Sequence, residues 1–338
     1  MLKAPGPDGE RGVIVTHFEY NWRRMVKGID DFATFTGDYD VIYTTSWSPP
    51  NYGALAMLLA VTPEEIMVQP NHRSDMSLVK AFHPRVSATR CIVSEWLLPE
   101  CSQPKEWNER DIDLLYVANW APFKRHREFF AVLKKLPKEL RVICVGQPDG
   151  GHTLQKVQAI KASMGVPQDI EFRERLPIDE VALLQARAKV AVLFSRREGA
   201  NIAAAEALLA GALLAMREDA HVGARAYVNA QTGALFSVHN AAEVLKGLLE
   251  RGGQMNPRGW AEVHLDSRMT IKGLNEQLRD WSAQRGLPWR RDLAVPFWRP
   301  YQKFACDEDR QRLLTEYGRL HERYPSVFLG DLIDTGHQ

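Results

Sequence analysis

Two glutamates beside a glycine form the group of residues in this sequence best suited to chemistry. Glu198 and Gly199 lie between an expected strand and an expected helix, and Glu206 follows within that helix. The N–H groups of a helix's first turn have no intrahelical acceptor and carry the positive end of the helix dipole. We therefore expect an anion-binding site at the start of this helix. At ~1.5 Å per helical residue, the two carboxylates lie ~12 Å apart. They can therefore hold hydroxyl groups at both ends of a sugar diphosphate.

The neighbouring residues leave space and supply positive charge. Gly199 lets the backbone approach a ligand closely, and the side chain of Ala200 is too small to block it. Lys124 and Arg125 stand at the expected start of another helix. A cation is unfavourable there unless an anion is near, which favours a phosphate contact over the alternative of an exposed first turn.

Two histidines in the N-terminal half are candidate catalytic residues. His17 ends the first expected strand (VIVTH), and His72 follows a later one (QPNHRSD). Ligand sites of open α/β sheets lie outside the carboxyl ends of the strands, which is where both would be. A structural, hydrogen-bonded histidine is the alternative reading for each. The other histidines lack metal-ligand spacing, and we expect no metal site.

Strands that alternate with helices must position these residues. Short runs rich in Val and Ile alternate with helical patterns, which predicts parallel sheets with crossover helices. Between residues 108 and 253 the expected strands are 111–118, 141–146, 170–172, 189–194 and 212–216, and the expected helices include 153–162, 179–186, 200–210 and 241–249. Between residues 1 and 107 the expected strands are 12–16, 39–44, 65–69 and 90–94, with helices at 52–60 and 74–82.

A third segment, 254–338, has a different pattern. It contains one or two helices within 258–284 and a terminal helix over 307–324. Between them, 285–303 interleaves bases with aromatic residues, as surfaces that stack nucleobases do. We favour the other interpretation, a tail that packs back on the N-terminal domain. The residues concerned are Trp289, Arg290, Arg291, Phe297, Trp298, Arg299, Tyr301, Lys303 and Phe304.

The composition is that of an ordinary globular protein. The chain has 338 residues, of which 45% are apolar and 25% charged, and 43 basic against 42 acidic side chains give a net charge of +1. This balance gives no global attraction to nucleic acid or membrane. The four cysteines are widely spaced, and the sequence shows neither a signal peptide nor a membrane-spanning run. We therefore expect a soluble cytoplasmic protein.

Taken together, residues 194–211 (FSRREGANIAAAEALLAG) resemble the Glu-x7-Glu motif, SxxEGxxxxxxEAxxxG, of retaining GT-B glycosyltransferases of the family 4 type. The flanking segments 111–124, 141–146 and 231–236 resemble the family's lysine loop, strand-to-glycine element and TG-hydrophobic loop. The resemblance covers 111–249 well and the N-terminal domain in outline. It implies an α/β, GT-B-like fold, with two Rossmann-like doubly wound domains facing each other across a cleft.

The resemblance also implies roles for particular residues. Glu206 would hold the ribose hydroxyls of a nucleoside-diphosphate sugar, and Glu198 a hydroxyl of the transferred sugar. The N–H groups of Asn201 and Ile202 would face the diphosphate.

Further implied contacts come from the flanking segments. Lys124 and Arg125 would neutralise the diphosphate, and Asn119 stands where the family often has an arginine. The backbone around Arg175 would flank the base. His72 lies where relatives place a sugar-facing histidine.

We therefore expect a metal-independent retaining glycosyltransferase that uses a nucleotide-sugar donor and no other cofactor. Two alternatives remain: an epimerase or hydrolase of GT-B fold, and a nucleic-acid-modifying or nucleic-acid-binding protein that uses the basic, aromatic tail. The sequence does not identify the donor base, the sugar or the acceptor.

Overall fold

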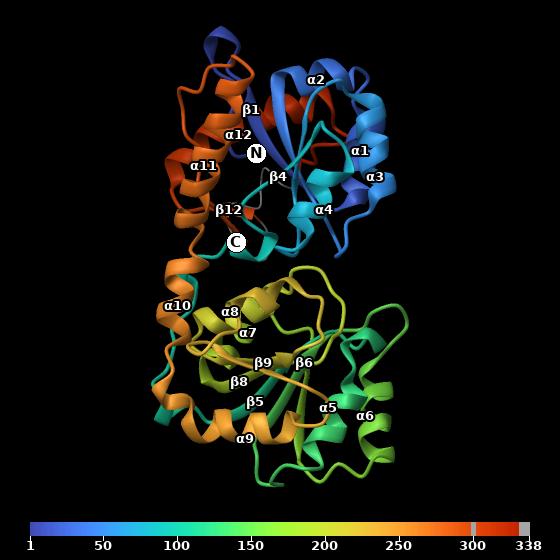
Figure 1. Cartoon of the computed structure of the whole chain (residues 1–338), viewed down its shortest axis with the longest axis vertical. Helices are drawn as coiled ribbons and strands as arrows, with labels where there is room; N and C mark the ends of the chain where they lie inside the picture. The colour runs from blue at the N-terminus through green and yellow to red at the C-terminus, as the bar shows by residue number, and fades with distance from the viewer. Residues whose placement is uncertain (299–301, 331–338) are drawn as a thin grey trace. The chain divides into compact units, whose positions relative to one another are not determined.

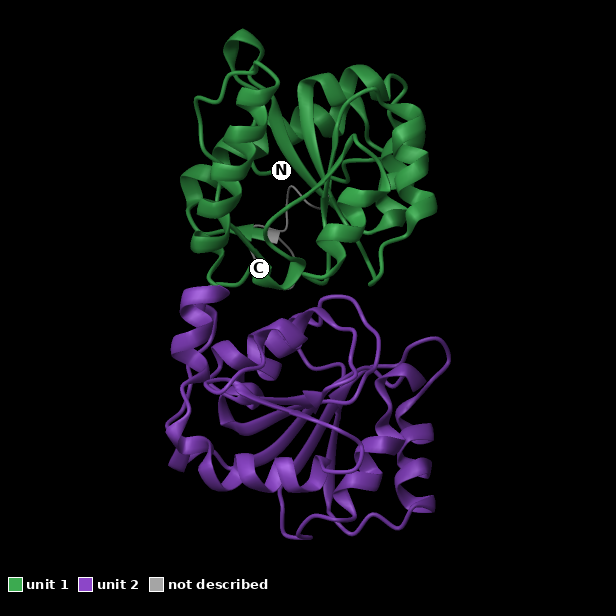
Figure 2. Ribbon diagram, viewed as in Figure 1, with its two compact units in different colours: residues 1–98, 266–338 green, residues 99–265 purple. Residues whose placement is uncertain are grey.

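The computed structural model describes residues 1–298 and 302–330, which form two compact units. Unit 1 combines Met1–Leu98 with the chain from Asp266 onward, and unit 2 is Pro99–Leu265 (Figure 2). The sequence placed the domain boundaries after residues 107 and 253. In the structure the chain enters unit 2 earlier, at Pro99, and leaves it later, after Leu265. The segments 99–107 and 254–265 both pack on unit 2. Arg110 donates to the carbonyls of Lys105 at 2.8 Å and Ala188 at 2.7 Å, and α10 (Pro257–His264) packs against α8 (Ile202–Leu209).

Unit 1 contains a sheet of four parallel strands in the order β1-β2-β3-β4. The strands are β1 (Gly12–His17), β2 (Tyr39–Thr44), β3 (Ile66–Gln69) and β4 (Val86–Ala88). The strand expected at 90–94 was wrong, because the fourth strand lies before that segment. Cys91 and Ile92 are buried in a loop instead, and the carboxylate of Glu95 accepts the Ile92 N–H at 3.2 Å.

Both faces of this sheet are covered by helices. The C-terminal α11 (Ser267–Gln284) packs against Val13, Val15 and Ile42 on one face. The opposite face packs against the helices of the N-terminal segment and against α12 (Asp307–Arg323) (Figure 1). Those N-terminal helices are α1 (Glu19–Gly28), α2 (Phe32–Asp38), α3 (Tyr52–Val61) and α4 (Asp75–Phe82).

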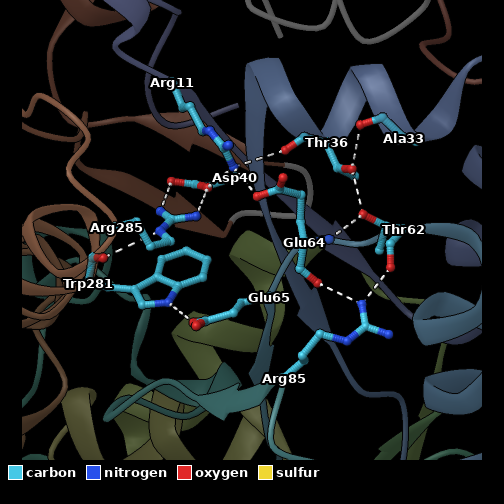
Figure 3. Close-up of polar contacts among 10 residues, drawn as sticks. All are labelled: Arg11, Ala33, Thr36, Asp40, Thr62, Glu64, Glu65, Arg85, Trp281 and Arg285. Atoms are coloured by element: carbon cyan, nitrogen blue, oxygen red, sulfur yellow. Dashed lines mark hydrogen bonds and ion pairs between the residues drawn. The ribbon is translucent and has the colours of Figure 1, made fainter.

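A polar network joins α11 to the amino ends of these strands (Figure 3). Arg285 donates to both oxygens of Asp40 at 2.8 Å, and its guanidinium lies 3.6 Å from the Trp281 ring centroid. Arg11 approaches Asp40 to 3.6 Å and pairs with Glu64 at 2.7 Å. The Asp40 side chain is only 3% exposed, so these contacts replace the water that its carboxylate loses on folding.

Other bases and aromatics of 285–303 are also engaged within unit 1. Lys3 lies 3.5 Å from the Trp289 ring centroid, and Arg290 pairs with Asp8 at 2.5 Å. Trp298 belongs to a short antiparallel pair, β11 (Pro296–Trp298) and β12 (Gln302–Phe304). Arg299 and Tyr301 lie outside the described residues.

Unit 2 is a doubly wound parallel sheet of six strands in the order β10-β9-β8-β5-β6-β7. Its helices cover both faces, with α7 and α8 on one side and α5 and α9 on the other (Figure 1). The strands are β5 (Ile112–Val117), β6 (Val142–Gly146), β7 (Ile170–Glu174), β8 (Ala188–Leu193), β9 (Leu213–Arg217) and β10 (Gly233–Phe236). The helices are α5 (His126–Leu133), α6 (Leu154–Ser163), α7 (Ile178–Arg187), α8 and α9 (Ala241–Arg251).

Candidate functional site

The segment after β8 turns into α8 through Asn201. Asn201 has φ 54°, in the left-handed region, and its side chain accepts the Ala204 N–H at 3.1 Å. This cap starts the helix at Ile202, two residues later than the sequence predicted. Glu206 is therefore four residues, or about 6 Å, along the helix. The assumption behind the ~12 Å separation, helix all the way from Glu198 to Glu206, was wrong.

Lys124 and Glu198 form a buried ion pair in unit 2. The Lys124 ammonium lies 2.5 Å from Oε2 of Glu198, and the two side chains are 11% and 7% exposed. Asn201 donates to the same oxygen at 3.1 Å. The other carboxylate oxygen, Oε1, is buried and has no hydrogen-bond partner among the described residues. A buried acceptor left in this way favours a ligand hydroxyl group.

A cavity of about 300 Å³ lies beside this pair. Six of the residues predicted from the sequence line it: Asn119, Lys124, Arg175, Glu198, Asn201 and Ile202. The remaining lining residues are Val117, Ala118, Val145, Gly146, Gln147, Leu176, Val181 and Ala203. The carboxyl ends of β5 and β6 and the start of α8 thus build one site.

The local backbone keeps this cavity open. A Cβ at Gly146 would lie 2.3 Å from the carbonyl oxygen of Ala118, so only glycine fits there. Arg175 has φ 56°, and its N–H donates to the Gly146 carbonyl at 2.9 Å. Tyr116 donates to the Lys124 carbonyl, which fixes the turn that carries the lysine.

The charges and dipoles around the cavity suit a polyanion. Among its lining residues Lys124 and Arg175 are cationic, and Glu198 is the only acid. Ile202 and Ala203 also line it, in the first turn of α8, where N–H groups lack intrahelical acceptors. A phosphate can therefore meet two side-chain cations and a helix N-terminus.

Four predicted residues are not among the residues that line this cavity. Arg125 has φ 60° and pairs with Glu128. The Gly199 carbonyl accepts the Gly223 N–H at 3.1 Å, and Ala200 is buried. Glu206 is half-buried on α8, beyond the cavity wall.

The two candidate histidines lie in unit 1, whereas the cavity lies in unit 2. His17 ends β1 with its ring centroid 5.0 Å from that of Trp298, and burial lowers its pKa to about 4. His72 accepts the Ser74 N–H through Nδ1 at 3.0 Å. That contact matches the structural role considered for His72.

Sequence reasoning missed several residues around the cavity. Gln147 follows β6 directly, so its place at a strand's carboxyl end could have identified it. Asp149 accepts from the Asn119 amide at 2.7 Å, which orients Asn119. Trp120 is buried and donates to Glu174 at 2.7 Å, a contact between two strand ends that no local pattern shows.

Within the described part of the chain, no helix is long and apolar enough to span a membrane. The same residues contain no group of three or more His, Cys, Asp or Glu side chains that could hold a metal ion.

Comparison with known families agrees with this architecture. Residues 99–251, which include the cavity, match the family described as Glycosyl transferases group 1. None of the curated proteins matches the sequence significantly.

Solved structures share the fold at low sequence identity. Sucrose-phosphate synthase from Thermosynechococcus elongatus is 13% identical, with a TM-score of 0.62 over 80% of this chain and 74% of that one. Anabaena Alr3699/HepE in complex with UDP-glucose is 13% identical, with a TM-score of 0.60 over 79% and 78%. The alpha,alpha-trehalose 6-phosphate synthase of Burkholderia multivorans is 14% identical, with a TM-score of 0.56 over 81% and 73%. The α/β, GT-B fold is thereby confirmed, and the family match supports a glycosyltransferase.

Proposed function

We propose that this protein transfers a sugar from a nucleoside-diphosphate sugar to an acceptor hydroxyl, with retention of the anomeric configuration and without a bound metal ion. The observation that carries the proposal is the cavity of unit 2. It combines the Lys124 ammonium, the first turn of α8 and the unpartnered Oε1 of Glu198. The Glu-x7-Glu resemblance supports the family 4 type and the stereochemistry.

Within this proposal the donor lies along the wall of the cavity. The diphosphate meets Lys124 and the N–H groups at the start of α8, and Oε1 of Glu198 accepts a hydroxyl of the transferred sugar. The ribose extends toward Glu206, and the base lies against the backbone near Arg175. A solved structure of the same fold was determined with UDP-glucose, which makes a uridine diphosphate sugar the first donor to test.

The chemical step breaks the bond between the anomeric carbon and the leaving phosphate oxygen. The acceptor oxygen then bonds to that carbon on the same face, and its proton passes to a leaving-phosphate oxygen. Preorganised N–H groups and Lys124 stabilise the charge that develops on the diphosphate. In this proposal Lys124 and Arg175 neutralise the diphosphate, which is the role that a divalent ion would otherwise have. We also propose that the protein is cytoplasmic, because its widely spaced cysteines suit a reducing compartment.

A thermal-shift screen tests the donor site. UDP-glucose and GDP-mannose should raise the melting temperature, since a ligand at a hundredfold excess over its dissociation constant adds ~2.7 kcal/mol to stability. Lys124→Ala should reduce the affinity at least tenfold, and the exposed Lys156→Ala is the matched control. If no nucleotide or sugar nucleotide shifts the melting temperature at millimolar concentration, the donor site is misassigned.

Product analysis tests the reaction itself. Transfer products should form with acceptor present, and a chelator should leave the rate unchanged. Loss of turnover with the chelator, restored by manganese or magnesium, would overturn metal independence. Epimerised or hydrolysed donor formed equally well without acceptor would identify the alternative enzyme class.

A further inference from the structure

Unit 1 contains a second cavity, of about 400 Å³, that shares no lining residue with the donor cavity. It lies against β1, α1 and α12, and its size falls within the range of small-molecule sites. Most of its wall is apolar and includes Ile14, Met25, Leu313, Tyr317, Val327 and Phe328.

Arg24 places a positive charge in this apolar wall. Its Nε is buried and has no hydrogen-bond partner among the described residues. The described residues that line the cavity include no aspartate or glutamate. A partly buried cation without an anion is costly, because the protein does not replace the lost hydration. An anionic ligand would supply the missing partner.

Burial shifts the pKa values of three other groups that line the cavity toward their neutral forms, and it lowers that of the Met1 amino group to about 6. Burial lowers the pKa of His17 to about 4, so its ring stays uncharged, and its buried Nε2 has no hydrogen-bond partner among the described residues. Burial raises the pKa of Tyr317 to about 12, which keeps that hydroxyl protonated. Arg24 is therefore the charged side chain of this wall, and His17 can add a neutral hydrogen bond.

We propose that this cavity binds an apolar molecule that carries an anionic group, either a carboxylate or a phosphate. The apolar body fills the space beside Met25 and Leu313, and the anion accepts charge-assisted hydrogen bonds from Arg24. The proposal goes beyond sugar transfer, because it stands on the residues of unit 1 alone.

Isothermal titration of the full chain with octanoate, octyl phosphate, 1-octanol and inorganic phosphate tests it. At least one of the two octyl anions should bind, and the better one identifies the preferred anionic group. Octanol should bind at least about tenfold more weakly, since it lacks the charge-assisted contact. Inorganic phosphate should bind weakly, because it fills none of the apolar volume. Octanol binding as tightly as both anions would overturn the proposal, as would tight binding of phosphate alone or no binding of either octyl anion.

Two variants locate the site. Arg24→Gln should weaken octyl-anion binding about tenfold or more while changing octanol binding little. Arg23→Gln, at the exposed neighbouring position of α1, is the matched control. Leu314→Trp should fill the cavity and weaken all three octyl ligands, with hydrogen exchange of the β1 and β2 peptides as the check that unit 1 is folded. Equal losses in Arg23→Gln and Arg24→Gln, or full affinity in Leu314→Trp, would refute the assignment.

Discussion

The buried pair between Lys124 and Glu198 makes a sharp prediction about stability. Replacing Lys124 with methionine keeps most of the apolar stem but removes the charge. The Glu198 side chain, 7% exposed, then keeps its negative charge with only the Asn201 amide, 3.1 Å away, as a hydrogen-bond donor among the described residues. Breaking a buried pair by removing one partner costs about 3–5 kcal/mol of unfolding free energy. Because the Asn201 hydrogen bond survives, we expect the lower end, about 3 kcal/mol.

A second substitution should recover most of this loss. In Lys124→Met with Glu198→Gln, neither partner is charged, and a neutral pair of similar volume is often as stable as the ion pair it replaces. The coupling energy of the double-mutant cycle should therefore be about 2–3 kcal/mol.

Hydrogen exchange by mass spectrometry is the suitable assay, because a chain of two units need not unfold in one transition. Exchange of β5 and β8 peptides reports the stability of unit 2. Lys156→Met, at an exposed position in the same unit, is the control and should change stability by less than ~0.5 kcal/mol. Additive single effects would mean that the two side chains do not interact, and an unchanged Lys124→Met would mean that the pair is not buried.

Three further predictions concern other groups. Glu198→Gln should lower turnover while leaving the affinity for the bare nucleoside diphosphate unchanged. Glu206→Ala should weaken that affinity, as measured by isothermal titration. Equal effects of the two substitutions on affinity would mean that the donor does not lie along α8 as proposed. Burial lowers the pKa of His126 from 6.5 to about 4, so unit 2 should lose about 3 kcal/mol as the pH falls through that window. His126→Phe should flatten this dependence in hydrogen exchange of unit 2, the exposed His239→Phe should not, and equal profiles would contradict the burial argument. Asp40→Asn should cost about 3–5 kcal/mol in unit 1, because Arg285 loses its partner, and unchanged hydrogen exchange of the β1 and β2 peptides would make the network of Figure 3 dispensable.

Much of unit 2 could be read from local patterns. A buried strand shows as a short run of Val and Ile, and a helix shows as apolar residues at helical spacing, so the strands from β5 to β9 lie close to the expected ranges. The loop between β8 and α8 was recognisable because a strand, a glycine and a helix start follow one another in the sequence. Local reasoning failed at 90–94, where burial of Cys91 and Ile92 in a loop imitates a strand.

The sequence by itself determined the alternating strands and helices and the residues suited to binding phosphate and hydroxyl groups. Both can be recognised from residues that lie close together along the chain. Only the tertiary structure decided which of those residues share a cavity. Lys124 reaches Glu198 because β5 and β8 pair side by side and their carboxyl ends bring distant loops together. Glu206 lies outside the cavity wall, although the first turn of the same helix, which begins after the left-handed Asn201, lines it. Arg24 becomes a candidate anion-binding residue only because α12 and β1 place apolar walls around it. Strand pairing, cap geometry and burial depend on contacts between distant residues, and no spacing along the chain encodes them.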